Sequence, residues 1–425
     1  MLKEDFLHYI WKYKLFNTSN LTTHNGVAVH VLNFGLHNTD AGPDFFNGKV
    51  KIGATTWAGN IELHINSSDW IKHKHQDDKA YDNVVLHVVY NNDKDILDKE
   101  GNAIPTLELK DLIDQQIIKK YEQLVLLPDS GIPCGKQIKT LDEFTINSWL
   151  NRLAIERLER KSAEIQVTLQ LNKNNWEETF YQYMFKYFGL KVNALPFELL
   201  AQKSPLKIIE KHHTISSIEA LLYGQAGYLD SDIEDEYYAK LKKEYQFLKA
   251  KFELVPLDKT IWKMLRLRPS NFPTIRISQL ANLLSIKTRL FSKVLAAETV
   301  VELQNLFNAK ASDYWKTHYQ FNETVENDTE KKLGIATINS IIINVIVPFT
   351  FVYGKAKQNE KLVDKSLKLL ESLKAENNII IKNWKALGVK SSNAMQTQSL
   401  IELKNNYCSQ KKCLNCSIGN KILQL

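Results

Sequence analysis

The first 110 residues alternate between apolar and polar positions in short runs, a pattern typical of strands. Strands are predicted at residues 27–32, 49–52, 57–65, 84–90 and 106–109. The second and third of these flank Gly53, which predicts a β-hairpin. Helical spacing precedes the strands over residues 4–16 and follows them over 112–127, so this part of the chain is predicted to mix helices and strands.

The pattern changes after the turn-forming segment 128–133, and most of the following sequence has the 3.6-residue periodicity of helices. The first of these helices is long and highly charged and is predicted at 145–171. We therefore predict a mixed α/β module over residues 1–133, followed by a mostly all-α body over 134–425. The body ends in a cysteine-rich tail at 408–416.

One apolar run, residues 335–352, is long enough to suggest a membrane span. It contains polar and helix-disfavouring residues that lipid would penalise: Asn339, Ser340, Asn344 and Pro348. We therefore predict a buried helix and no membrane partner. Because the N-terminus lacks a charged-then-apolar signal pattern, a cytoplasmic location is expected.

Composition is that of a globular protein, with 44% hydrophobic and 24% charged residues among 425. Charge is uneven, however: residues 1–110 carry 11 lysines, no arginine and 14 acids, a formal net of −3. Since the whole chain carries +7, the remainder carries +10. This division suits a metal site beside a surface that binds a polyanion such as nucleic acid, but it also suits an ordinary lysine-rich surface. Oligomeric state is left open.

Histidines concentrate near the N-terminus, where eight of the eleven lie within the first 87 residues. Among them, His64 follows Glu62 by two positions on a predicted strand, so both side chains project from one face. Asp44 opens the preceding hairpin. His37 lies just before Asp44, and His87 lies on a strand expected to pair near that of Glu62. These five residues are the predicted catalytic set, although His87 among valines also fits a hydrogen-bonded core histidine.

The layout of Gly42-Pro43-Asp44-Phe45, a β-hairpin and Glu62-Leu63-His64 resembles the PD-(D/E)XK nuclease superfamily. The resemblance implies a restriction-endonuclease-like fold and hydrolysis of phosphodiester bonds in DNA or RNA. It also implies Mg²⁺ or Mn²⁺ held by Asp44 and Glu62. His64 stands where the superfamily has lysine, and a histidine there can polarise water, act as a base or bind metal.

Longer blocks resemble an uncharacterised bacterial family of unknown function over nearly the full chain. These blocks are Ala41–Phe45, Glu62–Trp70, Arg266–Pro273 and the terminal cysteines. That resemblance implies no activity.

Two alternatives arise within the same region. His64, His73, His75 and His87 with a carboxylate suit zinc, manganese or iron, which would give a different metal-dependent hydrolase. His73 and His75 would face one metal on a strand and would be separated on a helix. Glu108-Leu109-Lys110 is a literal Glu-x-Lys on a predicted strand, but no Pro-Asp precedes its hairpin, so it ranks below Glu62.

The four cysteines predict a second metal site. Cys408, Cys413 and Cys416 form a Cys-x₄-Cys-x₂-Cys element, and Cys134 lies far upstream. Four thiolates suit a tetrahedral zinc ion or a 4Fe–4S cluster, and free thiols are the alternative. Such a site would bring the tail back to the end of the α/β module.

A basic segment with a tryptophan offers candidate nucleic-acid contacts at Arg266, Arg268 and Arg276. The sequence thus predicts a metal-dependent nuclease. The rival prediction is a non-catalytic nucleic-acid-binding or structural protein with a degenerate nuclease-like module and a four-cysteine metal site.

Overall fold

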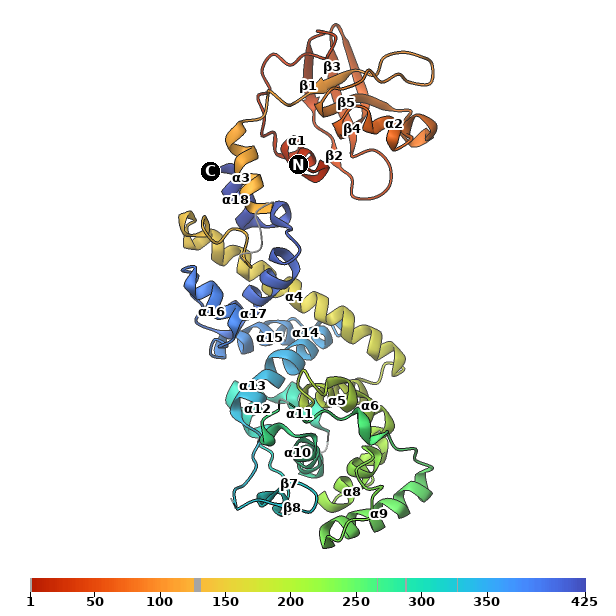
Figure 1. Ribbon diagram of the computed structural model, residues 1–425, viewed down its shortest axis with the longest axis vertical. Coiled ribbons are helices and arrows are strands. Elements are labelled where there is room, and N and C mark those ends of the chain that lie inside the picture. The colour runs from red at the N-terminus through yellow and green to blue at the C-terminus, as the bar shows by residue number, and fades with distance from the viewer. Residues whose placement is uncertain (1, 126–130, 266, 287–288, 327) are drawn as a thin grey trace. The chain divides into compact units, whose positions relative to one another are not determined.

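A computed structural model describes residues 2–125, 131–265, 267–286, 289–326 and 328–425. These residues form two compact units (Figure 1). The first unit comprises residues 1–149, 386–388 and 403–425, and the second comprises 150–385 and 389–402. The cysteine-rich tail therefore belongs to the same unit as the N-terminal module.

The first unit is built on a six-stranded sheet with the order β1-β3-β4-β5-β6, in which β2 also pairs with β3. Its strands are β1 (Val29–Asn33), β2 (Leu36–His37), β3 (Phe45–Ile52), β4 (Thr55–Asn66), β5 (Val84–Asn91) and β6 (Thr106–Glu108). The predicted hairpin is β3–β4, which is antiparallel. β5 and β6 run parallel to β4, so the chain crosses over between β4 and β5.

The centre of β4 is buried on both faces of the sheet. Ile61 and Leu63 contribute apolar side chains to one face, and Glu62 and His64 alternate with them on the other. Helix α1 (Glu4–Tyr13) packs against β4, and its apolar side is buried. The polar pair on β4 is therefore shielded from water by neighbouring elements.

The crossover from β4 to β5 consists of three short turns of helix: α2 (Asp69–Lys72), η1 (His75–Asp77) and η2 (Lys79–Tyr81). Between the first two, Lys74 adopts a left-handed conformation with φ of 62°. A left-handed residue reverses the direction of the chain at the end of a helical turn. The crossover consequently folds back toward β4.

The remaining elements of the first unit come from both ends of the chain. They are α3 (Gln115–Val125), η3 (Ile138–Thr140), η8 (Leu403–Cys408), η9 (Cys413–Asn415) and α18 (Ser417–Gln424). Helices α3 and α18 pack together, and the Tyr9 hydroxyl donates to the Asn420 carbonyl at 3.4 Å. The long helix α4 (Glu143–Leu171) begins in this unit and continues into the second.

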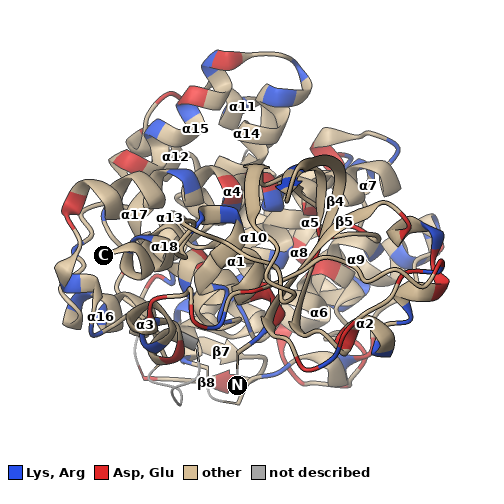
Figure 2. Cartoon of the chain, turned by 90° about the horizontal axis from the view of Figure 1, so that it is seen from above, with Lys and Arg blue, Asp and Glu red and all other residues tan. Residues whose placement is uncertain are grey.

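The second unit is almost entirely helical. After α4 its helices are α5 (Trp176–Phe188), α6 (Ala194–Lys203), α7 (Leu206–Ile209), α8 (Ile215–Gln225), α9 (Glu236–Phe252), α10 (Pro273–Ile286), α11 (Leu290–Ala296), α12 (Val300–Leu306), α13 (Ile335–Ile341), α14 (Val347–Ala356), α15 (Glu360–Ser372), α16 (Ile379–Ala386) and α17 (Ala394–Glu402). Short helical turns η4 (Lys259–Ile261), η5 (Pro269–Asn271) and η6 (Asp313–Lys316) and the strands β7 (His318–Gln320) and β8 (Glu323–Thr324) lie between them. Lys and Arg are interspersed with Asp and Glu along the helices (Figure 2).

The apolar run forms a continuous helical segment in which a π-helical turn, η7 (Ile342–Ile346), joins α13 to α14. By length and composition this segment, Ile335–Ala356, is the one candidate membrane span among the described residues. Its most apolar window is 67% buried against the rest of the protein, as a core helix would be. The prediction of a mixed α/β region followed by a mostly helical one is confirmed.

Candidate metal and catalytic site

Asp44 and Glu62 are held side by side by hydrogen bonds across the β3–β4 hairpin. The Asp44 backbone N–H donates to Glu62 Oε2 at 3.1 Å, and the Leu63 backbone N–H donates to Asp44 Oδ2 at 2.9 Å. Each carboxylate is thus fixed by the strand that carries the other. The sequence predicted that these two acids would be neighbours, and the structure brings them together.

Three histidines surround His64. Its Nδ1 lies 2.8 Å from His87 Nε2, and its Nε2 lies 3.1 Å from His73 Nδ1. The side chains of His64, His73 and His75 each offer a ring nitrogen within 4.8 Å of the other two. The buried His75 Nε2 lies 3.3 Å from Glu62 Oε1 and has no hydrogen-bond partner among the described residues.

Helix α1 brings two further polar residues to the site that the sequence had not singled out. His8 Nε2 lies 3.1 Å from Asp44 Oδ2, and Glu4 Oε1 lies 3.9 Å from His64 Nε2. Glu4 and His8 are four residues apart and so share one face of the helix. The sequence did contain a signal for these two residues: they are polar, but they lie on the side of α1 that carries buried apolar residues.

Burial sets the protonation of the central groups. Burial, with the charge of Asp44, raises the pKa of Glu62 to about 8. Burial, with the neighbouring histidines, lowers the pKa of His64 to about 2, and burial lowers that of His87 to about 3. Burial alone would lower the pKa of His8, but its hydrogen bond to Asp44 and the charge of Asp44 outweigh burial and raise it. His64 is therefore neutral at physiological pH, whereas Asp44 stabilises the protonated form of His8.

These geometries define what the site can do. A neutral imidazole cannot provide the positive charge of a lysine, but it is the form that binds metal ions. Glu62 and His64 present an oxygen and a nitrogen ligand from β4, and His73 and His75 present nitrogen ligands from the crossover. Nitrogen-rich sets of this kind suit Mn²⁺, Fe²⁺ or Zn²⁺ better than Mg²⁺, which prefers oxygen.

His73 and His75 reach the site by a route that neither a strand nor a helix provides. His73 is the C-cap residue that follows α2, and His75 begins η1, with the left-handed Lys74 between them. The reversal at Lys74 turns both rings toward His64. The sequence left open whether this segment is a strand or a helix; it consists of short helical turns, and the two histidines converge all the same.

The other predicted catalytic residues lie close by in different roles. His37 is exposed on β2, and its ring contacts that of His8 with centroids 5.7 Å apart. His87 is fully buried on β5, in register with Glu62, and contacts His64 rather than Glu62. The rival Glu108 lies on β6, where it pairs with Val89.

The basic residues predicted to contact nucleic acid differ from one another in their exposure to solvent. Arg276 is 3% exposed, and its guanidinium donates to Asn271 and Gln279 at 2.6 and 3.1 Å, so it braces a helix junction. Burial lowers the pKa of Arg276 to about 10. Trp262 is also buried, with its Nε1 donating to Ala226 at 2.8 Å. Arg268 is exposed, and Arg266 lies outside the described residues.

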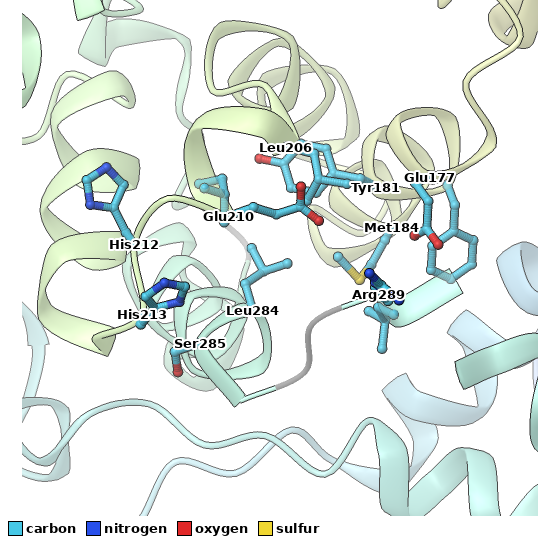
Figure 3. Close-up of a pocket in the computed structure, with 13 residues that line it drawn as sticks. Glu177, Tyr181, Met184, Leu206, Glu210, His212, His213, Leu284, Ser285 and Arg289 are labelled. Carbon is cyan, nitrogen blue, oxygen red and sulfur yellow. The ribbon is translucent and has the colours of Figure 1, made fainter. Parts of the chain in front are cut away.

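The helical unit contains a separate small pocket. Glu177, Glu210 and Arg289 stand around a floor that includes Met184 and Leu284 (Figure 3). The Glu177 carboxylate already forms hydrogen bonds within the protein, since it accepts from the Phe291 backbone N–H at 3.3 Å and from the Ser292 hydroxyl at 3.1 Å. This carboxylate caps the start of α11, so we place the candidate site in the first unit.

The profile of a family described as "Protein of unknown function (DUF2851)" matches residues 4–379. The chain belongs to this family. No curated protein and no solved structure matches it. The matched range contains the carboxylates, the histidines and Cys134, and it ends before the three C-terminal cysteines. The family description assigns no activity, so function has to be argued from the site.

His87 allows a first test of the metal site. A metal-binding histidine usually has its second ring nitrogen fixed by a partner, and loss of the partner typically costs about 10- to 100-fold in metal affinity. We expect His87→Leu, which removes the partner of His64 Nδ1, to weaken Mn²⁺ or Zn²⁺ binding by that amount in isothermal titration calorimetry. His30→Leu, at an exposed histidine on β1, serves as the control. Equal affinity in both variants would argue against His64 as a ligand.

Proposed function

We propose that the first unit is a PD-(D/E)XK-type nuclease module that hydrolyses phosphodiester bonds with a divalent metal ion. The observation that carries the proposal is the pairing of Asp44 and Glu62 across the β3–β4 hairpin, with His64 two positions beyond Glu62. Asp44 opens the hairpin, and Glu62 and His64 share a face of its second strand. This geometry supports the proposal.

The proposal adapts the nuclease motif to histidine. Glu62, His64 and His75 would hold the metal, with Asp44 and His73 beside them, and Mn²⁺ is favoured over Mg²⁺ by the nitrogen ligands. A bound divalent ion would stabilise charge on the phosphate and activate a water molecule. His8 takes the place of the missing lysine as the cation, because Asp44 favours its protonated form. It is placed to attract the phosphate or to hold a proton for the leaving oxygen.

A cleavage assay tests this function. The full chain is incubated with single- and double-stranded DNA and RNA of defined length in Mn²⁺, Mg²⁺ or Zn²⁺, with EDTA as the metal-free control. We expect metal-dependent cleavage that is faster in Mn²⁺ than in Mg²⁺. Binding of nucleic acid without cleavage in any metal would instead favour the rival function, a non-catalytic nucleic-acid-binding protein.

A further inference from the structure

The four cysteines, which the proposed nuclease chemistry does not use, surround one cavity in the first unit. Cys134, Cys408, Cys413 and Cys416 are all buried and free of disulfides. They line one small cavity together with apolar residues that include Leu403 and Ile418. Four sulfurs from two distant parts of the sequence thus converge in one buried space.

The spacing of the sulfurs discriminates between the two kinds of metal centre. Tetrahedral zinc, with Zn–S bonds of about 2.3 Å, holds its sulfurs about 3.8 Å from one another. Among the described residues, the group whose ligand atoms lie within 4.8 Å of one another is His64, His73 and His75, and it includes none of these sulfurs. An iron–sulfur cluster distributes its thiolates over several iron atoms, so they stand farther apart than they do around a single ion.

The surroundings also suit an anionic cluster shielded from water. Cys416 immediately precedes α18, whose N-terminal dipole favours a thiolate at that position. The close approach of α18 to the Cys413 loop requires glycine at 419, because a Cβ there would lie 2.1 Å from the Cys413 carbonyl oxygen. The Cys413 sulfur also lies 4.0 Å from the Leu124 carbonyl of α3.

We infer that these four cysteines bind an iron–sulfur cluster that joins the C-terminal tail to α3 and to the segment carrying Cys134. The inference does not depend on the proposed nuclease activity. Because four thiolates are available, the expected form is 4Fe–4S.

Metal analysis of the full chain purified without oxygen tests the inference. We expect a brown protein with about four iron and about four acid-labile sulfide ions per chain, and visible absorption that bleaches on reduction. Cys134→Ser and Cys416→Ser should lose the iron and the colour, whereas Ile418→Val, in the same cavity, should keep both. A colourless protein with zinc, or one with no metal, would overturn the assignment.

Reconstitution covers the case in which the cysteine variants do not fold. Iron is removed from the unmodified protein with a chelator, and the protein is then supplied without oxygen either with equal amounts of Fe²⁺ and Fe³⁺ together with sulfide or with Zn²⁺ alone. We expect iron and sulfide to restore the colour and the resistance of the C-terminal tail to protease. Equal protection by Zn²⁺ would count against the cluster.

Discussion

Glu62→Gln is expected to reduce metal-dependent cleavage by about 10²- to 10³-fold or more, the usual cost of removing one preorganised charged group from an active site. The substitution keeps the shape of the side chain and an oxygen that can accept from the Asp44 backbone N–H. It removes only the negative charge that a divalent ion needs. Initial rates at saturating Mn²⁺, with the substrate that the cleavage assay identifies, measure the effect.

The same variant should be at least as stable as the unmodified protein when metal is absent. The pKa of Glu62 is about 8 in the folded protein and 4.5 without the fold, so the folded state binds more protons between these values. The contribution of Glu62 to the stability of the metal-free protein should therefore fall as pH rises from about 4.5 to about 8, and the glutamine should remove it. The lowered pKa values of His64 and His87 contribute the opposite slope below their ordinary value of 6.5, so the difference between the two proteins isolates Glu62. Thermal unfolding in EDTA at several pH values measures it.

These opposite effects distinguish a functional carboxylate from a structural one. If Glu62 only supports the fold, its replacement should lower stability and activity together. Glu108→Gln is the matched control, because Glu108 begins the other Glu-x-Lys triplet and lies on β6 of the same sheet. It should leave cleavage unchanged. Full activity in Glu62→Gln would remove Glu62 from the catalytic set.

The two-residue period of β4 was enough to predict that Glu62 and His64 share a face, because strand alternation is a local property. The adjacency of Asp44 also followed from sequence, since a hairpin brings its two strands together. These predictions needed only the geometry of neighbouring segments.

Other features of the site depend on tertiary contacts that local sequence patterns encode only in part or not at all. The convergence of His73 and His75 requires one left-handed residue, Lys74, and lysine gives no signal for that conformation. His8 and Glu4 enter through the packing of α1 on the sheet. Arg276 shows the converse case: a residue proposed as a surface contact stands between Ile275 and Ile277 in α10, and its guanidinium is buried.

His64→Lys, which restores the superfamily's motif lysine, is expected to abolish metal binding rather than to improve cleavage. His64 is 1% exposed, and its two ring nitrogens contact His87 and His73. An ammonium group only donates hydrogen bonds and cannot ligate a metal ion while it is protonated. We expect a loss of about 10²-fold or more in cleavage, as for other preorganised groups, and no Mn²⁺ binding in calorimetry.

The outcome decides which role the histidine has taken. If His64 merely substitutes for lysine as a water-orienting group, the lysine variant should match or exceed the natural activity. Two carboxylates lie close enough to neutralise the added charge, because Glu62 Oε1 and Glu4 Oε1 lie 3.7 and 3.9 Å from His64 Nε2. If His64 is a ligand, the lysine removes the metal, and His8 alone cannot sustain cleavage. His30→Lys, on exposed β1, controls for added charge. Retained Mn²⁺ affinity in His64→Lys would show that His64 is not a ligand and that Glu62 and His75 hold the ion without it.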